Sequence, residues 1–391
     1  MLDQIIKYTS KLVADRSAQP DMIAFAAQDD SIVSAGNAEL AALASDILSH
    51  LDCLALTVAR PSLPFADFLL RRSASDELTI IPRDTETRTF LHDIPILRHN
   101  GFGPDPARTI AALLGNRKGI VVEGIGIIAS GTVTVEQAYI NWSSVFHSTY
   151  IKYLEDLLES GFIFPEESDV FKHFRTTWLL PLSADGLTFR QGPLSDRAHI
   201  LEELVQVGRY TVQCGLVDSF FGNISYLHDR LIYISQTASS LDELSACIDP
   251  VPFTNCSTVG ITASSELVAH RSIYETTECR AILHGHPRFA VIMSMLCQDQ
   301  DNCDVADCWK ECKKVRFLGE TPVVAGEIGA GGLAKNVPPV IGRSGRAIVY
   351  GHGVFSIGMT DFRDAFQGLV DVENWCREEY FRRFDEKNYQ I

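Results

Sequence analysis

The chain has 391 residues, of which 46% are hydrophobic, and this length favours two or three domains with well-filled cores. Acidic residues number 50 against 34 lysines and arginines, so the formal net charge is −16. No basic cluster offsets this charge, and nucleic acids and anionic membranes are therefore not expected as partners. The first residues lack the basic start and apolar run of a signal peptide, and glycines and charges interrupt the longest apolar stretches. We expect a cytoplasmic protein.

Residues 1–160 are predicted to form a first domain in which strands and helices alternate. Three stretches are rich in apolar residues and predict strands: 31–36, 54–61 and 119–128. A long helix is expected to follow, from Val135 to about Leu158. Glycine and proline then punctuate residues 161–193, which predicts a connector with some packed structure rather than a flexible linker.

Residues 194–391 are predicted to form a second domain. A helix is expected from about Ser195 to Gln213, where apolar residues recur with a period near 3.6, and a long one from Asp361 to about Phe384. Short β-branched stretches predict strands at 231–235, 280–284 and 347–350. Because these strands do not each follow a crossover helix, we expect an α/β fold whose central sheet is mixed or rich in antiparallel pairs, with helices on both faces.

Three histidines of the second domain are placed to bind one metal ion. His284 and His286 end a predicted strand, in which side chains two residues apart point to the same face. His352 follows another apolar stretch and lies between two glycines. Three protein ligands with an open fourth position are typical of a catalytic metal, and histidine suits Zn²⁺ or another divalent ion.

Glu266, in the run Ser264-Ser265-Glu266, is the candidate general base beside that metal. A simpler alternative is that Glu266 is only an acidic residue at the start of a helix, with one of the serines as its cap.

The order of predicted elements is the same in the two domains, which indicates an internal duplication. The first copy has lost the metal ligands. Val58, Arg60 and Ile125 stand where the second copy has His284, His286 and His352. Glu39 corresponds to Glu266 but has no evident task without a metal. Coincidental similarity between strand–helix segments is the alternative.

Four of the ten cysteines lie close together in the sequence: Cys297, Cys303, Cys308 and Cys312. Polar and acidic residues flank them, whereas buried structural cysteines usually have apolar neighbours. A second metal or an iron–sulfur cluster is therefore one interpretation. Their spacing fits no common ligand pattern, and free thiols in a reducing compartment are the preferred expectation.

The second domain resembles the class II aldolase/adducin family. Five motifs carry the resemblance, in the family's order: Gly222-Asn223-Ile224-Ser225, Tyr233 to Ala238, Ser264-Ser265-Glu266, His284-Gly285-His286 and Gly351-His352-Gly353. The resemblance implies a three-layer αβα domain, and residues 1–160 resemble the same domain without its ligands.

The family resemblance also implies roles for individual residues. The three histidines would hold Zn²⁺ or another divalent ion that chelates a ketose or ketose phosphate, and Glu266 would move the proton. Four further residues match positions that bind phosphate in sugar-phosphate members: Asn223, Thr237, Ser264 and Ser265. Ala238 stands where that turn usually has glycine, and alanine is disfavoured at positive φ, so the turn or the anion site is expected to differ. Tyr380 or Tyr389, if not simply a surface aromatic, would be the acid/base tyrosine that family members lend to a neighbouring subunit.

Together these observations predict a metal-dependent lyase that cleaves or forms a C–C bond in a small hydroxylated carbonyl compound, with a sugar phosphate as the expected substrate. A divalent ion would stabilise the enediolate that such chemistry requires. Decarboxylase, dehydratase or epimerase chemistry at the same site is the first alternative. A non-enzymatic, adducin-like scaffold is the second, although a scaffold has no reason to keep three converging histidines. We expect a homo-oligomer, in which the first domain is a structural partner of the second.

Overall fold

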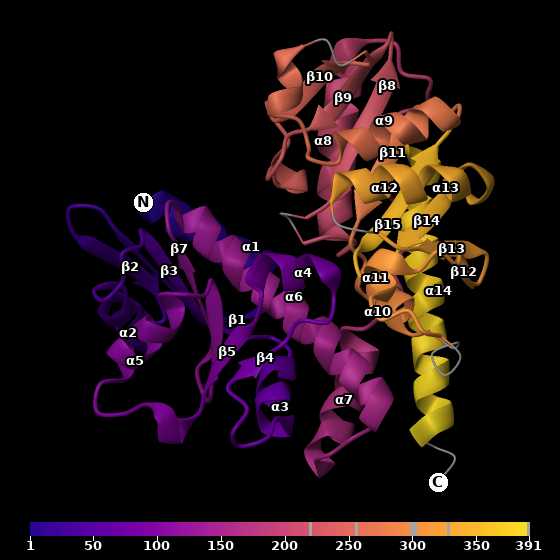
Figure 1. Cartoon of the computed structure of the whole chain (residues 1–391). Helices are drawn as coiled ribbons and strands as arrows, with labels where there is room; N and C mark the ends of the chain where they lie inside the picture. Colours follow the sequence, from indigo (N-terminus) through magenta and orange to yellow (C-terminus); the bar gives the residue numbers. More distant parts are fainter. Residues whose placement is uncertain (219–220, 255–256, 298–302, 327–328, 389–391) are drawn as a thin grey trace. The chain divides into compact units, whose positions relative to one another are not determined.

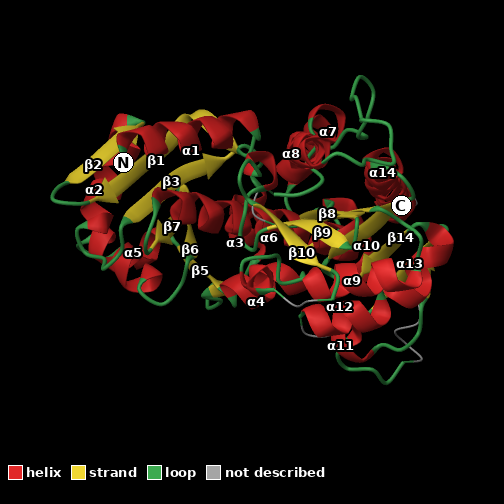
Figure 2. Ribbon diagram, turned by 90° about the horizontal axis from the view of Figure 1, so that it is seen from above, coloured by secondary structure: helices red, strands yellow, loops and turns green. Residues whose placement is uncertain are grey.

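The computed structural model describes five stretches of the chain: residues 1–218, 221–254, 257–297, 303–326 and 329–388. The chain divides into two compact units, Met1–Leu179 and Leu180–Ile391, each built on a mixed sheet with helices on both faces (Figures 1 and 2). The predicted α/β class with antiparallel-rich sheets is therefore confirmed. Within the described part of the chain, no helix has the length and apolar character needed to cross a bilayer.

The first unit contains a seven-stranded sheet in the order β2-β1-β3-β7-β6-β5-β4. Its strands are β1 (Ala18–Gln28), β2 (Ile32–Gly36), β3 (Ala55–Pro61), β4 (Thr79–Ile80), β5 (Ile94–Leu97), β6 (Gly119–Val122) and β7 (Gly126–Gly131). Its α-helices are α1 (Leu2–Ala14), α2 (Ala38–Leu48), α3 (Phe65–Arg72), α4 (Thr85–Leu91), α5 (Pro106–Leu114), α6 (Val135–Ser160) and α7 (Pro165–Thr177). A short 3₁₀ helix spans His99–Gly101. α1 and α6 pack on one face of the sheet, and α2 and α5 cover the other.

The segment predicted as a connector, 161–193, is divided between the two units. Helix α7 lies in the first unit, where the Arg72 guanidinium donates to both carboxylate oxygens of Glu167 at 2.7 and 3.0 Å. The side chains of this pair are 6% and 0% exposed. A buried pair with two parallel hydrogen bonds holds α7 firmly to α3. Residues 161–179 are thus packed structure of the first unit.

The second unit contains an eight-stranded sheet in the order β10-β9-β8-β11-β15-β14-β13-β12. Its strands are β8 (Asn223–His228), β9 (Leu231–Ser235), β10 (Ile248–Pro252), β11 (Ala281–Gly285), β12 (Arg316–Leu318), β13 (Thr321–Val324), β14 (Arg346–Val349) and β15 (Gly353–Gly358). Its α-helices are α8 (Arg197–Gln213), α9 (Leu267–Thr276), α10 (Arg288–Met295), α11 (Cys308–Glu311), α12 (Ala330–Asn336), α13 (Pro338–Ser344) and α14 (Phe362–Asn388), and 3₁₀ helices span Leu241–Glu243 and Thr258–Ile261.

Helices close both faces of the second sheet. Figure 2 shows α8 and α14 on one side and α9, α12 and α13 on the other. The core under α9, α12 and α13 consists mainly of aliphatic side chains from the helices and from β9, β11, β14 and β15, together with the rings of Tyr274 and Phe355. Burial of this apolar surface, at about 25 cal/mol per Å², fixes the central strands that carry the candidate site.

The two sheets share one topology. β1 to β7 follow the same order and directions as β8, β9 and β11 to β15, with one parallel pair in each sheet, β5/β6 and β13/β14. The register also agrees. Ala55 pairs with Gly131 across β3 and β7, as Ala281 pairs with Gly358 across β11 and β15. Counted from these pairs, Val58 holds the place that His284 holds in the second sheet.

Candidate metal centre

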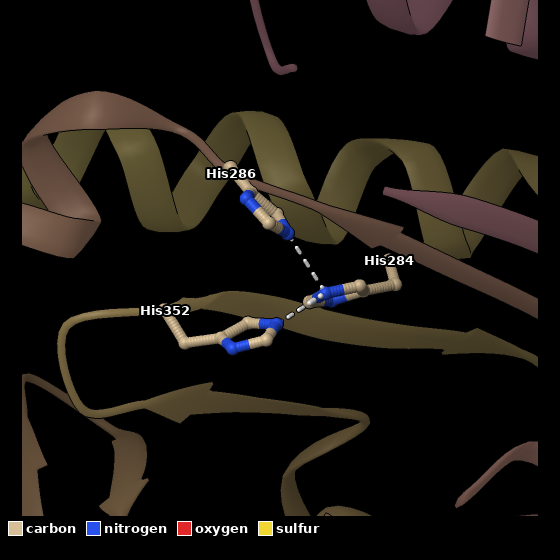
Figure 3. A group of neighbouring side chains, drawn as sticks. All are labelled: His284, His286 and His352. Atoms are coloured by element: carbon tan, nitrogen blue, oxygen red, sulfur yellow. Dashed lines mark hydrogen bonds between the residues drawn. The ribbon is translucent and has the colours of Figure 1, made fainter. Parts of the chain in front are cut away.

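Adjacent strands of the second sheet bring the three histidines together. His284 lies in β11, His286 follows the last residue of that strand, and His352 lies in the turn between β14 and β15. β15 pairs with both β11 and β14, so the last residues of β11 and the β14–β15 turn meet at the same end of these central strands. Figure 3 shows the three rings pointing toward one another from these segments.

The imidazole nitrogens of these residues converge closely. Nε2 of His284 lies 3.0 Å from Nε2 of His286 and 3.1 Å from Nε2 of His352. One ligand atom from each of the three lies within 4.8 Å of the others. Among the residues that the structure describes, this is the one group of three or more His, Cys, Asp or Glu side chains with ligand atoms so arranged.

Close packing keeps the rings in place. The ring of His284 lies on that of Phe355, with centroids 4.0 Å apart and planes at 14°. A Cβ atom at Gly353 would come within 2.4 Å of the Gly285 carbonyl oxygen and within 2.8 Å of the His286 ring. The glycine after His352 is therefore required by the close approach of strand and rings. The second glycine of the Gly-His-Gly motif is thus explained by this close approach, in addition to any part it has in forming the turn.

Hydrogen bonding and burial prepare His284 as a ligand. Its Nδ1 lies 3.0 Å from the carbonyl oxygen of Val354, which accepts from an Nδ1–H, so the lone pair is on Nε2, facing the other rings. Burial is the main cause that lowers the pKa of His284 to about 4, against the opposing charge of Glu266. The ring is therefore neutral at pH 7, which is the form that binds metal.

Glu266 directs its carboxylate at the same point. It precedes α9, and its Oε1 lies 3.3 Å from Nε2 of His352 while its Oε2 lies 3.5 Å from Nε2 of His284. Burial by itself would raise the pKa of this carboxyl group, but the neighbouring histidines and the amide of Asn223 outweigh burial and hold the pKa well below its usual range. The side chain makes no capping hydrogen bond to α9. Glu266 nevertheless holds the N-cap position of α9, and its N–H donates to Oγ of Ser264 at 3.3 Å, so the place at the helix start and the approach to the histidines occur together.

The donor set fits a divalent cation. Nε2 of His284 lies 3.0 and 3.1 Å from the other two imidazole nitrogens, which would bring lone pairs into contact unless a cation or protons lie between them. A carboxylate beside them adds negative charge to a mostly buried pocket of neutral ligands. Three histidines leave a further coordination position open, as catalytic zinc sites do.

The residues predicted to bind phosphate lie on segments that the sheet brings together. Asn223 begins β8, and its neighbour β9 leads into the turn that holds Thr237. The N–H of Thr237 donates to Thr262 at 3.0 Å and the N–H of Ser264 donates to Ser235 at 2.9 Å, which places the turn beside the Ser264-Ser265 run. Thr237 and Ser265 are exposed, whereas Ser264 is buried and its Oγ accepts from the N–H of Glu266 at 3.3 Å.

Ala238 adopts a left-handed conformation with φ of 58°. The sequence led us to expect a changed turn or a changed anion site, because alanine is disfavoured at positive φ. The backbone of Ala238 nevertheless remains in the conformation that glycine favours. The substitution therefore costs conformational energy, of about 1–2 kcal/mol.

Two residues near the site, His270 and Tyr274, were missed by the sequence analysis, and a third, Ser225, was named only as part of a motif. His270 lies one helical turn after Glu266 in α9, and its Nε2 is 2.5 Å from Oδ1 of Asn223. Its Nδ1 is 2.6 Å from Oγ of Ser225, which is 2.8 Å from the hydroxyl of Tyr274. The only signal in the sequence is the four-residue spacing from Glu266 to His270, which places both on one helix face.

The structure tests one of the two tyrosines that were predicted as acid/base groups. Tyr380 has no exposed surface and packs on Phe289 with ring centroids 5.3 Å apart, so it is a core residue, neither a surface aromatic nor accessible to a neighbouring subunit. Tyr389 lies outside the described residues.

All four clustered cysteines line one surface cavity of ≈ 1090 Å³. Burial, and then the charges of the other three thiols, raise the pKa of Cys308.

The corresponding positions of the first unit carry different chemistry. Val58 is buried, and Arg60 donates a hydrogen bond to the carbonyl oxygen of Gly124, the residue before Ile125. Glu39 is exposed in the first turn of α2. Within the described residues of this unit, no converging set of metal ligands occurs.

The chain was compared with curated proteins, solved structures and family models. The comparison with curated proteins gave no match. Among solved structures, an L-fuculose-1-phosphate aldolase from Thermus thermophilus is 22% identical, covers 49% of this chain and 99% of its own, and has a TM-score of 0.40. YgbL from Klebsiella pneumoniae is 24% identical over 47% of this chain and 89% of its own, with a TM-score of 0.39. Residues 202–380 match the family model described as "Class II Aldolase and Adducin N-terminal domain". This segment of the second unit therefore matches the class II aldolase/adducin family.

Proposed function

We propose that the second unit is a metal-dependent lyase that cleaves or forms a C–C bond in a small hydroxylated carbonyl compound, with a sugar phosphate as the expected substrate. The observation that carries this proposal is the convergence of His284, His286 and His352 with the carboxylate of Glu266 3.3–3.5 Å from two of them. A scaffold protein would have no use for such a donor set in its interior.

Each site residue has a task in this chemistry. The three histidines would hold Zn²⁺ or another divalent ion, which when bound supplies positive charge to stabilise an enediolate. Glu266 would remove a proton from, or return it to, the substrate carbon that becomes part of the enediolate. Asn223, Thr237, Ser264 and Ser265 would bind the substrate's phosphate through N–H and hydroxyl groups.

Other reactions use the same elements. Decarboxylase, dehydratase and epimerase reactions also pass through enolate-like intermediates, and the same donor set would serve them. The reaction is therefore assigned at the level of enolate chemistry at a divalent metal, with C–C cleavage as the preferred member.

We further propose that the first unit arose by duplication of the second and now has a structural role in a cytoplasmic homo-oligomer. The common strand order and the matching register of β3/β7 and β11/β15 support the duplication. Light scattering should give a mass of at least a dimer, and removal of residues 1–179 should abolish turnover. A monomeric full-length chain, or a fully active second unit, would contradict this part of the proposal.

Turnover of a panel of ketose 1-phosphates, beginning with L-fuculose 1-phosphate, tests the reaction. Aldehyde and dihydroxyacetone phosphate should form, the activity should vanish after chelation, and Zn²⁺ should restore it. The His352→Ala variant should lose this activity. His199→Ala should keep it and is the matched control, because His199 is an exposed histidine of the same unit. Release of CO₂ or loss of water without C–C cleavage would select one of the alternative reactions.

A further inference from the structure

A continuous chain of buried hydrogen bonds runs from Glu266 into the core of the second unit. The Asn223 amide nitrogen lies 2.8 Å from Oε2 of Glu266, and its amide oxygen lies 2.5 Å from Nε2 of His270. Nδ1 of His270 lies 2.6 Å from Oγ of Ser225, which lies 2.8 Å from the hydroxyl of Tyr274. The four residues behind Glu266 are 0–6% exposed.

The direction of every link follows from the orientation of the Asn223 amide. Asn223 donates from its NH₂ group to Oε2 of Glu266, and its oxygen faces Nε2 of His270. His270 must then donate from Nε2, which leaves Nδ1 as an acceptor. The hydroxyl of Ser225 therefore donates to Nδ1, and its own oxygen remains available to accept from Tyr274, whose hydroxyl also lies 3.2 Å from the carbonyl oxygen of Arg280. The donors of Ser225, His270 and Asn223 thus all point toward Oε2 of Glu266.

We propose that His270, held by Ser225 and Tyr274, is a positioning residue that fixes the amide of Asn223 and thereby commits Oε2 of Glu266 to accepting a hydrogen bond, so that Oε1 is the oxygen that takes the substrate's proton. This inference rests on the proposed role of Glu266 as the base. In the proton-transfer step, the substrate C–H bond breaks, its electron pair remains on the substrate as the enediolate, and the proton forms an O–H bond with Oε1.

The arrangement gives the base a single orientation. Oε1 lies on the side of His352, at 3.3 Å from its Nε2, where the three histidine rings converge. If Asn223 were free to turn its amide, its oxygen could face the carboxylate, and repulsion between the two acceptors would displace Glu266. A displacement of about 1 Å at a reacting group can cost 10²-fold in rate. The chain therefore acts on catalysis without contact between His270 and the reacting atoms.

Two substitutions at His270 separate positioning from simple packing. Glutamine is long enough to present an N–H where Nε2 of histidine lies, whereas asparagine reaches only to the position of Nδ1 and leaves Asn223 without its donor. Both variants lose the ring, so both lose a similar part of the packing. Tyr226→Phe is the control for a lost buried hydroxyl, because Tyr226 neighbours Ser225 in β8 and bonds Thr360 at 2.8 Å on the other face of the strand.

The activity assay uses dihydroxyacetone phosphate in D₂O, with loss of the carbon-bound proton signal followed by NMR. His270→Asn should lower kcat by about 10- to 100-fold with little change in KM, and His270→Gln should restore most of the loss. Metal content and KM report whether the site itself has survived. Equal kcat values for the two variants, or a kcat loss in Tyr226→Phe as large as that in His270→Asn, would overturn the positioning role.

A second measurement does not depend on the reaction. The ¹⁵N shifts of histidine-labelled full-length protein distinguish the two imidazole tautomers, and His270→Gln identifies the signal. We expect His270 with its proton on Nε2, and loss of this fixed tautomer in Ser225→Ala. A proton on Nδ1 in the wild type would overturn the inferred direction of the chain. If the wild type holds the expected tautomer but exchanges no proton of dihydroxyacetone phosphate, the proposed function fails and the assignment of Oε1 fails with it.

Discussion

Oε1 of Glu266 and Nε2 of His352 lie 3.3 Å apart, although the two residues come from the start of α9 and from the β14–β15 turn. Both side chains retain a little exposure, 13% for Glu266 and 15% for His352, whereas His284 is 1% exposed. Glu266 and His352 therefore form the side of the candidate site that a small molecule can reach.

Glu266→Gln should separate catalysis from folding. Glutamine keeps the shape of the side chain and can still accept from Asn223, but it cannot take up a proton as a base. We expect unchanged melting temperature and metal content and a fall in turnover of about 10²–10⁴-fold. Glu275→Gln, an exposed glutamate on the same helix, is the control. Full turnover in Glu266→Gln would show that this carboxylate is not the base.

Ala238→Gly should stabilise the protein. The φ of 58° costs alanine about 1–2 kcal/mol, and the greater freedom of glycine in the unfolded chain returns part of this. Urea unfolding should therefore show a net gain of about 0.5–1 kcal/mol. Ala246→Gly, at an exposed turn with φ of 64°, should give a similar gain. A loss of stability in both variants would contradict the strained turn, and a change of substrate KM in Ala238→Gly alone would connect this turn to anion binding.

The stability of the second unit should fall as the pH rises from about 4.5 to about 7. Glu373 of α14 accepts from the N–H groups of Phe289 and Ala290 at 3.0 and 2.9 Å, and burial raises its pKa to about 7 against the opposing effect of these bonds and of Arg288 and Arg377. Between the usual pKa near 4.5 and the raised value, the folded state holds a proton that the unfolded state has lost. Stability is therefore full below this window and decreases through it, by on the order of 3 kcal/mol.

The variant Glu373→Gln checks that assignment. Glutamine is neutral at every pH, and its oxygen can still accept from an N–H group at the start of α10. The slope of unfolding free energy against pH should therefore become smaller. Glu378→Gln, an exposed position on the same helix, should keep the wild-type slope. An unchanged slope in Glu373→Gln would place the pH dependence elsewhere.

The clustered cysteines should react with thiol reagents as free thiols. Although Cys297, Cys303, Cys308 and Cys312 share one cavity, their sulfur atoms do not converge as the histidine nitrogens do. Denatured protein prepared anaerobically should therefore show ten reactive thiols, equal to its ten cysteines, and no visible absorbance before denaturation. In the native state Cys303 should react first, because it alone of the four is exposed. A coloured protein would indicate an iron–sulfur cluster.

Local patterns in the sequence predicted the elements well. The strand expected at 231–235 is β9, with the same ends, and the helix expected from Ser195 to Gln213 is α8, two residues shorter. Periodicity is a property of neighbouring residues and is readable in one segment. The common direction of the His284 and His286 side chains could be predicted for the same reason, because it depends only on their two-residue spacing along one strand.

What the sequence did not reveal depends on contacts between distant segments. The buried pair of Arg72 and Glu167 joins residues 95 apart and makes α7 part of the first unit. The bond between Asn223 and His270 joins residues 47 apart. The burial of Tyr380 likewise follows from the packing of α14 on α10. No pattern within a single segment encodes such contacts.

Metal content per chain tests the central claim most directly. Elemental analysis of purified wild type, supplied with Zn²⁺ and then freed of unbound metal by gel filtration, should give about one divalent ion per chain. His352→Ala should lower this value strongly because a third of the histidine ligands is lost. His199→Ala should keep the wild-type value. Full occupancy in His352→Ala, or no divalent metal in wild-type protein supplied with Zn²⁺, would contradict the assignment of His284, His286 and His352 as a metal site.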